Sequence, residues 1–237
     1  MSVRQESSTT SAMARAGCRD SIAVIVAYLP FGLALGATLA AGSVHPLVAW
    51  SSSPLLFGGA AQLLSVQMLD AGGSAAVVIV GALVVNARML LYSASLAPHV
   101  RTWRGRWRWV GAYFLADPVY ALTLARFRRP DHGGDARDRL AYYLAVGLTL
   151  WTAWQLMTAA GTVLAGVLPA SLRLELAAPL TFLLLLLPML TSRSTYAAAG
   201  VGGAVAVAAS GLPLGLGLLV GATAGMIAGA LVEGRHA

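Results

Sequence analysis

Long apolar stretches separated by short polar joints run along most of the chain. After the polar residues 1–20, they lie at roughly 21–42, 47–69, 74–98, 108–126, 140–168, 176–191, 194–210 and 212–232. A helix needs about 20 residues to cross the hydrocarbon core of a bilayer. The pattern predicts an all-α, polytopic integral membrane protein with about seven or eight hydrophobic segments. We expect residues 1–20 to be a disordered polar tail and residues 21–232 to form a single transmembrane domain.

Several segments are short or interrupted, so we expect some of them to be broken or re-entrant. The stretches after residue 175 are short for a full span, and Pro54 and the Gly58-Gly59 pair interrupt the stretch 47–69. Broken backbone at membrane depth is tolerated where it is buried in protein or lines a cavity.

The distribution of arginine favours 47–69 as a segment that does not cross. Arginines cluster in residues 1–20 and again in residues 101–108, and arginine-rich joints face the cytoplasm. Three apolar stretches separate the clusters, and an odd number of crossings would put them on opposite sides. Either one stretch turns back or one cluster lies outside. We expect the first arrangement, in a multi-pass protein of the inner (plasma) membrane with a cytoplasmic N-terminus.

The first apolar stretch has a second interpretation, a cleaved secretory signal ending at Ala40-Ala41-Gly42. The preceding polar part is long and the stretch 21–42 is of membrane length, which favours a membrane helix. A weak similarity between residues 29–35 and 212–218 indicates either an internal repeat of interrupted helices or chance in a chain rich in Leu, Gly and Ala.

The stretch 84–101 is unusually polar for a membrane helix. At about 100° per residue, a stripe about 60° wide holds Arg88, Tyr92, Ser95 and His99. Asn86 and Ser93 fall on the opposite face. An arginine at the bilayer centre costs about 2.5–3.5 kcal/mol on insertion scales. This helix must therefore face protein or water on both sides.

Polar residues at membrane depth are the candidate binding groups, and they are Gln62, Ser65, Asn86, Arg88, Tyr92 and Ser93. Asp117 is the acidic residue well inside an apolar stretch. Arg88 or a helix N-terminus can hold a carboxylate, Asp117 and side-chain amides an ammonium, and aliphatic walls an apolar side chain. Asp117 and His99 are the candidates for coupling to an ion, because each can bind and release a proton.

Each candidate also has a structural interpretation. The amides and hydroxyls can equally serve as contacts between helices, worth about 0.6 kcal/mol each on average. Arg88 and Asp117 can equally form a structural ion pair, and His99 beside Pro98 can simply lie at the membrane interface.

Two further patterns predict structure rather than binding. Tryptophans interleaved with arginines are typical of a membrane-interface belt, and here they are Trp103, Trp107 and Trp109. Thr158 and Gly161, which follow Trp154, predict a close-packed helix face.

Composition excludes several other classes of protein. Hydrophobic residues make up 58% of the chain and charged residues 11%, far from the balance of a soluble domain. The net charge of +7 comes from arginines between apolar stretches, which are membrane-flanking charges. No HExxH, GxSxG or Cys/His metal cluster occurs, and the single cysteine, Cys18, can form no internal disulfide. We expect no enzymatic activity, no cofactor, no metal and no nucleic-acid partner.

Three motifs resemble the AzlC-type branched-chain amino acid permease family. They are Gly59-Ala60-Ala61-Gln62, Asn86-Ala87-Arg88 and Leu91-Tyr92-Ser93-Ala94-Ser95-Leu96-Ala97-Pro98. The resemblance covers nearly the whole chain, and the last two motifs are its specific part. The chain departs from the pattern at Asp117-Pro118, where the family commonly has Asp-Glu, and at Glu175-Leu176, where it often has Asp-Phe.

The resemblance implies the large subunit of a two-component secondary transporter that exports leucine, isoleucine, valine and possible analogues such as methionine. It also implies a partner, a small hydrophobic AzlD-type membrane subunit. A second helical partner would cover the two polar faces of the stretch 84–101, although a homodimer could cover them too. The residues alone leave open a channel or permease for another small solute, or a scaffold subunit that transports nothing.

Overall fold

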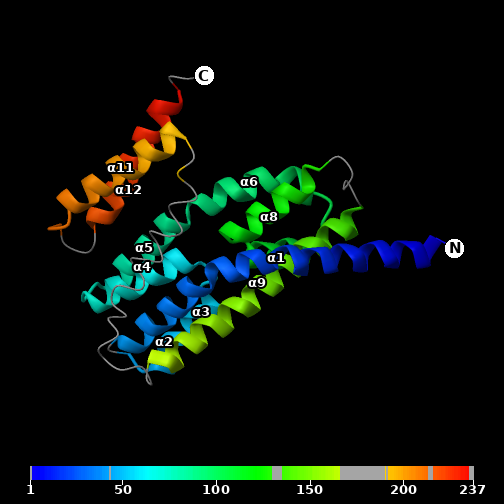
Figure 1. The fold of residues 1–237 in the computed structure, drawn as a ribbon, viewed down its shortest axis with the longest axis horizontal. Coiled ribbons are helices and arrows are strands. Elements are labelled where there is room, and N and C mark those ends of the chain that lie inside the picture. Colours follow the sequence, from blue (N-terminus) through cyan, green and yellow to red (C-terminus); the bar gives the residue numbers. More distant parts are fainter. Residues whose placement is uncertain are drawn as a thin grey trace.

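The computed structural model describes residues 2–42, 44–129, 135–165, 190, 192–212 and 216–234. Every regular element within these residues is a helix (Figure 1). The helices are α1 (Ser2–Ala41), α2 (Pro46–Trp50), α3 (Ser52–Leu55), α4 (Gly59–Asp70), α5 (Ala75–Asn86), α6 (Arg88–Val100), α7 (Gly105–Phe114), α8 (Asp117–Phe127), α9 (Ala136–Ala165), α11 (Arg193–Ala208) and α12 (Leu216–Glu233).

The long helices α1 and α9 lie side by side and form the frame of the fold (Figure 1). Gly17 of α1 packs against Tyr142 of α9, and the same number of residues further along each helix Gly32 packs against Met157. The two helices therefore run parallel, and their N-terminal halves lie at the same end of the frame.

Small residues allow the two frame helices to approach closely. A β carbon added to Gly36 or Gly161 would collide with the backbone of the opposite helix. The hydroxyl of Thr162 donates a hydrogen bond to the carbonyl of Gly36 at 3.0 Å. The close-packed face that the sequence predicted at Thr158 and Gly161 is confirmed, because both residues lie in this contact.

The first twenty residues differ from the sequence expectation. Helix α1 begins at Ser2, so the polar segment expected to be disordered continues the apolar helix. The hydroxyl of Thr10 donates to Asp138 at 2.6 Å, and the hydroxyl of Tyr142 donates to Asp20 at 3.0 Å. These bonds tie the polar turns to α9, a partner that local composition does not reveal.

The segment between α1 and α5 enters and leaves at the same end of the frame. Helices α2 and α3 lead to a break at residues 56–58, and α4 leads back out. A β carbon added to Gly42, just after α1, would lie 3.2 Å from Oδ1 of Asp70, the last residue of α4. Gly59, at the start of α4, packs against Trp154 in the middle of α9. This segment is a hairpin that is broken at its tip, as the interrupted sequence of 47–69 predicted; that it does not cross the membrane stays a prediction.

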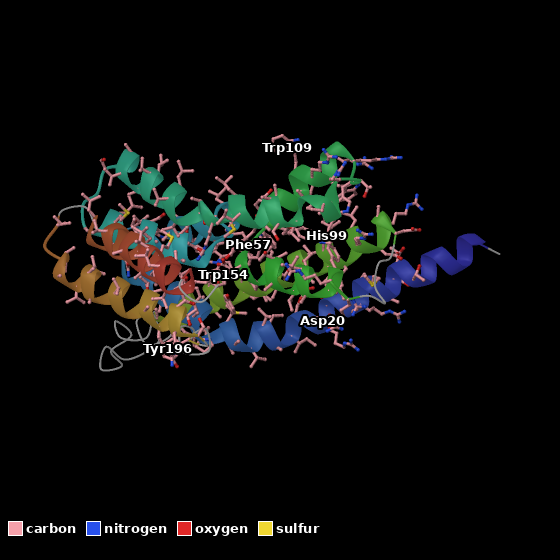
Figure 2. The ribbon with its side chains drawn as sticks, turned by 90° about the horizontal axis from the view of Figure 1, so that it is seen from above. Asp20, Phe57, His99, Trp109, Trp154 and Tyr196 are labelled. Carbon is pink, nitrogen blue, oxygen red and sulfur yellow. The ribbon has the colours of Figure 1, made fainter. Side chains whose placement is uncertain are left out.

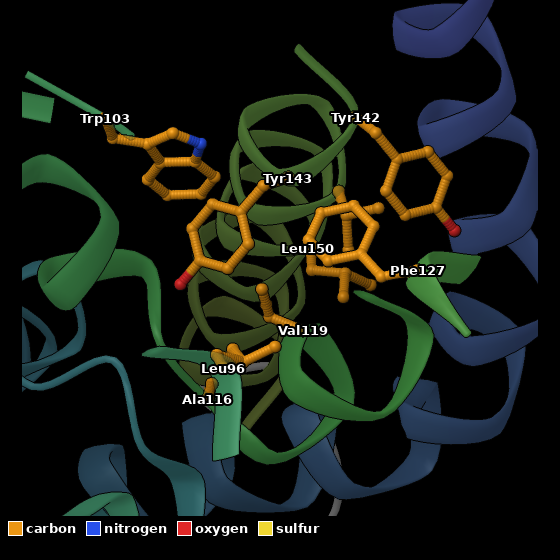
Figure 3. Close-up of a cluster of buried hydrophobic side chains, with 9 residues drawn as sticks. Leu96, Trp103, Ala116, Val119, Phe127, Tyr142, Tyr143 and Leu150 are labelled. Carbon is orange, nitrogen blue, oxygen red and sulfur yellow. The ribbon is translucent and has the colours of Figure 1, made fainter. Parts of the chain in front are cut away.

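Helices α7 and α8 form a second hairpin, which enters from the opposite end. Trp103 before α7 and Phe127 at the end of α8 pack against the neighbouring Tyr143 and Tyr142 near the start of α9 (Figure 3). Pro118 explains the break between the two helices. A proline ring clashes with the carbonyl four residues earlier, and α7 ends at that residue.

Between the hairpins, α5 and α6 carry the chain from one end of the frame to the other. At one end, Gly81 of α5 packs against Met68 of α4. At the other, His99 contacts Phe127 with ring centroids 5.5 Å apart. Residues 101–108 therefore lie at the same end as the N-terminal half of α1. Among the described residues, two segments are long and apolar enough to span a membrane, Thr9–Ala41 and Ala75–Val100.

A buried cluster fixes α6, α7 and α8 against the frame (Figure 3). Its members are Leu96, Trp103, Ala116, Val119, Phe127, Tyr142, Tyr143, Val146 and Leu150. Helices α6 and α8 contribute members directly, and Trp103 and Ala116 lie on either side of α7. Burial of apolar side chains therefore sets the positions of these elements.

Helices α11 and α12 form a separate antiparallel pair joined by glycine contacts. Gly202 and Gly225 approach each other through their backbones. Glu175 and residues 213–215 of the weak repeat lie outside the described residues.

We expect Gly161→Ala to lower the free energy of unfolding by about 1–3 kcal/mol, because the added carbon would collide with the backbone of Leu33. Gly200→Ala is the matched control, since nothing lies within 4 Å of its added carbon and alanine favours helix. Thermal unfolding in mild detergent, followed by tryptophan fluorescence, measures both. An unchanged Tm for Gly161→Ala would contradict the close approach.

Candidate functional site

The breaks of both hairpins face one cavity in the middle of the frame. The cavity has a volume of about 40 Å³ and is lined by Phe57 and Gly58 from the first hairpin, by Ala116 from the second, and by Tyr28 and Trp154 from the frame. Phe57 and Trp154 lie near the middle of the molecule in Figure 2. The volume holds a few water molecules, so this is a closed conformation with respect to anything larger.

The backbone at these breaks is extended rather than helical. Gly58 has φ −164° and ψ 90°, and Ala116 has φ −142° and ψ 164°. A third break lies between α5 and α6, where the N–H of Ala87 donates to the carbonyl of Val84, three residues earlier, at 3.2 Å. A β carbon added to Gly58 would lie 3.4 Å from Oδ1 of Asn86. The break before α6 therefore adjoins the first hairpin.

An ion pair joins the third break to the second hairpin. Nη2 of Arg88, the first residue of α6, lies 2.9 Å from Oδ2 of Asp117, the first residue of α8. The hydroxyl of Tyr92 donates to the other oxygen, Oδ1, at 3.0 Å. Both carboxylate oxygens are thus occupied, and Ala116 and Pro118 on either side of Asp117 line the cavity.

The helix ends affect the two charges differently. The N-terminus of a helix carries partial positive charge. Asp117 lies in the first turn of α8, so this partial charge stabilises its carboxylate. The same effect disfavours Arg88 at the start of α6, and the carboxylate offsets it. Both side chains are about one third exposed, at 36% and 37%.

Arg88 retains donors that Asp117 does not use. Its Nε is buried and has no hydrogen-bond partner among the described residues. A guanidinium has five N–H donors in a planar fork, so a second acceptor group could bind beside Asp117.

The predicted polar stripe of α6 is confirmed as the face that packs against α8. Beyond Tyr92, the hydroxyl of Tyr120 donates to Ser95 at 3.0 Å. The rings of Tyr92 and Tyr120 stack with centroids 4.2 Å apart and an interplanar angle of 8°. His99 completes the stripe against Phe127.

Gln62 is saturated by other side chains. It is 1% exposed, its amide donates to the hydroxyls of Ser52 and Ser53 at 2.8 Å each, and its oxygen accepts from the indole of Trp154 at 3.3 Å. In this conformation Gln62 of α4 links the two arms of the first hairpin to each other and to Trp154 of the frame. Any contact with a ligand would require these bonds to exchange.

The remaining predicted residues lie apart from the ion pair. Ser93 is exposed on the outer face of α6. Ser65 donates to the carbonyl of Ala61 within α4. His99 lies about 16 Å along α6 from Arg88 at 1.5 Å per residue, near the arginine-rich end (Figure 2).

Sequence reasoning missed the aromatic residues of the site. Tyr120 lies three residues after Asp117, which places both on one face of α8, and this spacing was an available signal. Tyr28 and Phe57 gave no such signal, because an aromatic residue in an apolar stretch is ordinary core composition.

Comparison with known proteins identifies the family. The family described as AzlC protein matches residues 23–168, more than half of the chain. The chain belongs to the AzlC family. An uncharacterized membrane protein of Archaeoglobus fulgidus is 30% identical over 94% of this chain and 95% of its own length. No solved structure matches.

The AzlC relatives are membrane proteins by name. The inner membrane protein YgaZ of Escherichia coli is 25% identical over 61% of this chain, a match that spans 58% of YgaZ. An uncharacterized membrane protein of Helicobacter pylori is 27% identical over half of each chain. With its two apolar spans, this AzlC protein is a helical membrane protein.

We expect Arg88→Met and Asp117→Leu each to lower the Tm, because each leaves one charge of the pair uncompensated. The double variant is expected to unfold at a higher temperature than either single variant. Thermal unfolding of the four proteins in mild detergent gives this order, and Arg15→Met at an exposed position of α1 controls for loss of charge. A double variant less stable than both singles would show that the charges are independent.

Proposed function

We propose that this chain is the large subunit of a secondary transporter that exports branched-chain and other hydrophobic amino acids. Membership of the AzlC family supports a membrane permease. The observation that carries the proposal is the Arg88–Asp117 pair beside a cavity formed by helix breaks. Transporters commonly bind their substrates at such breaks near the bilayer midplane.

The chemistry of the site fits a zwitterion with an aliphatic side chain. The unused donors of Arg88 suit a carboxylate, and Asp117 suits an ammonium group. Val24, Ile25 and Leu150 supply apolar cavity walls. The carboxylate of a bound amino acid would pair with Arg88 and its ammonium group with Asp117. Neither charge of the ion pair would then be left uncompensated.

Movement of the two hairpins would provide alternating access. They enter from opposite ends, and both reach the cavity. Outside the cavity lining, the hydroxyl of Tyr113 in α7 donates to the carbonyl of Pro54 in α3 at 2.5 Å and joins the two hairpins. Opening one hairpin while the other stays closed would expose the site to one side of the membrane. The parallel frame would stay fixed.

The proposal extends to orientation and coupling. The arginine-rich end holds the N-terminal half of α1 and residues 101–108, so we place it in the cytoplasm. Asp117 is the first candidate for ion coupling, because it lies in the ion pair. His99, near the cytoplasmic end, is a second candidate.

A small AzlD-type subunit would cover the outer face of α5 and α6. Large apolar side chains there are 58–73% exposed, and they include Ile79, Leu83, Leu90 and Leu91. A partner helix could pack on this face. A channel for another small solute is the alternative within transport, and a scaffold subunit without activity is the alternative outside it.

Efflux of radiolabelled leucine, isoleucine, valine and methionine tests the function. Vesicles containing this chain together with its small partner are expected to release preloaded label faster than empty vesicles, and alanine and lysine are the control solutes. The chain alone is expected to give little efflux, because the α5–α6 face is uncovered. Full efflux without the partner would refute the two-component proposal, and no efflux of any amino acid with the partner would refute export.

Arg88→Ala is expected to abolish efflux while the protein stays in the membrane, because the substrate carboxylate loses its partner. Arg88→Lys should also fail, at least about tenfold below wild type, since an ammonium group cannot replace a planar fork. Arg19→Ala, in an exposed turn of α1, is the matched control and should export normally. Wild-type efflux from well-expressed Arg88→Ala would remove Arg88 from the binding site.

A further inference from the structure

A second polar pocket lies at the arginine-rich end, away from the central site. It has a volume of about 270 Å³ and is lined by the joint before α7 and the first turns of α7 and α9. Arg104, Arg106 and Arg137 contribute to the lining together with Trp103 and Trp107, and none of the described acidic residues does. The walls of this pocket are therefore positively charged.

Trp103, which lines the pocket, carries an unused hydrogen-bond donor. Its side chain is 4% exposed and packs edge-on against Tyr143 with ring centroids 5.2 Å apart. Its indole Nε1 is buried without a hydrogen-bond partner among the described residues. Buried donors are almost always paired, and an indole N–H can only donate. A ligand that satisfies it must present an acceptor.

Two helix N-termini add to the positive potential. Arg104 is the N-cap of α7 and makes no capping hydrogen bond through its side chain. Ala136 and Arg137, also in the lining, begin α9. The first N–H groups of a helix have no partner within the helix and attract anions.

The three arginines are not neutralised by ion pairs in the part of the chain that the structure describes, where ion pairs involve Arg19 and Arg88. Arg106 instead lies over the ring of Trp107, with its Cζ 5.5 Å from the centroid. The nearby carboxylate of Asp138 accepts a hydrogen bond from Thr10 of α1. Asp138 lies outside the lining and forms no ion pair with the three arginines among the described residues, so their donors are available to a ligand.

The surroundings indicate a ligand from the membrane. Trp109, in the next turn of α7, is 81% exposed and lies on the outer edge of the molecule (Figure 2). Exposed tryptophan beside arginine marks the level of the lipid headgroups, where basic pockets between helices bind anionic lipids.

We propose that this pocket binds the phosphate group of an anionic phospholipid, held by Arg104, Arg106 and Arg137 and by the indole N–H of Trp103. The site is separate from the proposed transport site and does not depend on what that site carries. Its ligand chemistry is a phosphate oxyanion, and its position favours a lipid headgroup over free phosphate as the source.

Native mass spectrometry of the delipidated chain in mild detergent tests the proposal. Phosphatidylglycerol and phosphatidylcholine are titrated into the protein in parallel series. Inorganic phosphate is added in a separate series, as the soluble source of a phosphate group. We expect phosphatidylglycerol to bind at least about tenfold more tightly than phosphatidylcholine. The variant Arg104→Gln/Arg106→Gln/Arg137→Gln should lower the affinity for phosphatidylglycerol about 100-fold, because each charge near the surface contributes about fivefold.

A matched variant separates the pocket from general charge. Arg15→Gln/Arg19→Gln/Arg128→Gln removes three exposed arginines outside the lining and should keep most of the affinity. Trp103→Phe keeps an aromatic ring and removes the N–H, so binding should weaken about tenfold even if the triple pocket variant does not fold. Equal weakening by both triple variants, unchanged binding by Trp103→Phe, or millimolar phosphate displacing all bound lipid would each overturn the assignment.

Discussion

Helix breaks at membrane depth impose the constraint on which this structure depends. A break exposes backbone N–H and C=O groups, and lipid offers them no hydrogen bonds. The protein covers them with side chains from other elements. The carbonyl of Pro54 accepts from Tyr113 and that of Ser53 from Gln155. Each hairpin is stable because the frame and the other hairpin surround it.

The contacts that hold the frame together differ in kind from those that hold the first hairpin to it. Backbone contact at Gly36 and Gly161 leaves α1 and α9 no freedom to slide, since any shift would bring carbonyl groups into collision. The tip of the first hairpin meets the frame differently, through Gly59 against the rings of Phe31 and Trp154. Side chains can change rotamer, whereas backbone in contact cannot yield.

The first break was predicted from a local cause, because Pro54 and the Gly58-Gly59 pair interrupt the stretch 47–69. The second break also has a local cause, Pro118, but the stretch 108–126 was expected to be one apolar segment and is instead divided into α7 and α8. The break at Ala87 has neither proline nor glycine beside it, so no local signal exists. It coincides with the ion pair of Arg88 and Asp117, a contact between helices that no single segment encodes. The helical tail depends in the same way on Asp138 of α9.

The predicted site shows the same difference between local signals and contacts between helices. Helical periodicity placed Arg88, Tyr92, Ser95 and His99 on one face, and the structure packs that face on α8, because a 100° rotation per residue is a local property. The saturation of Gln62 could not be foreseen, since its partners Ser52 and Ser53 come from a different helix. Periodicity identifies a face, but the neighbour that the face meets is a property of the whole fold.

The ion pair connects this architecture to the proposed chemistry. An arginine alone at membrane depth is costly, and so is an aspartate alone. Paired across two helix starts, each compensates the other in the closed conformation. A zwitterion is the kind of ligand that can separate them without leaving a charge unpaired, whereas a neutral solute offers no charges in exchange. Under the proposed function, a site that holds two opposite charges when empty would for the same reason be selective for ligands that carry both.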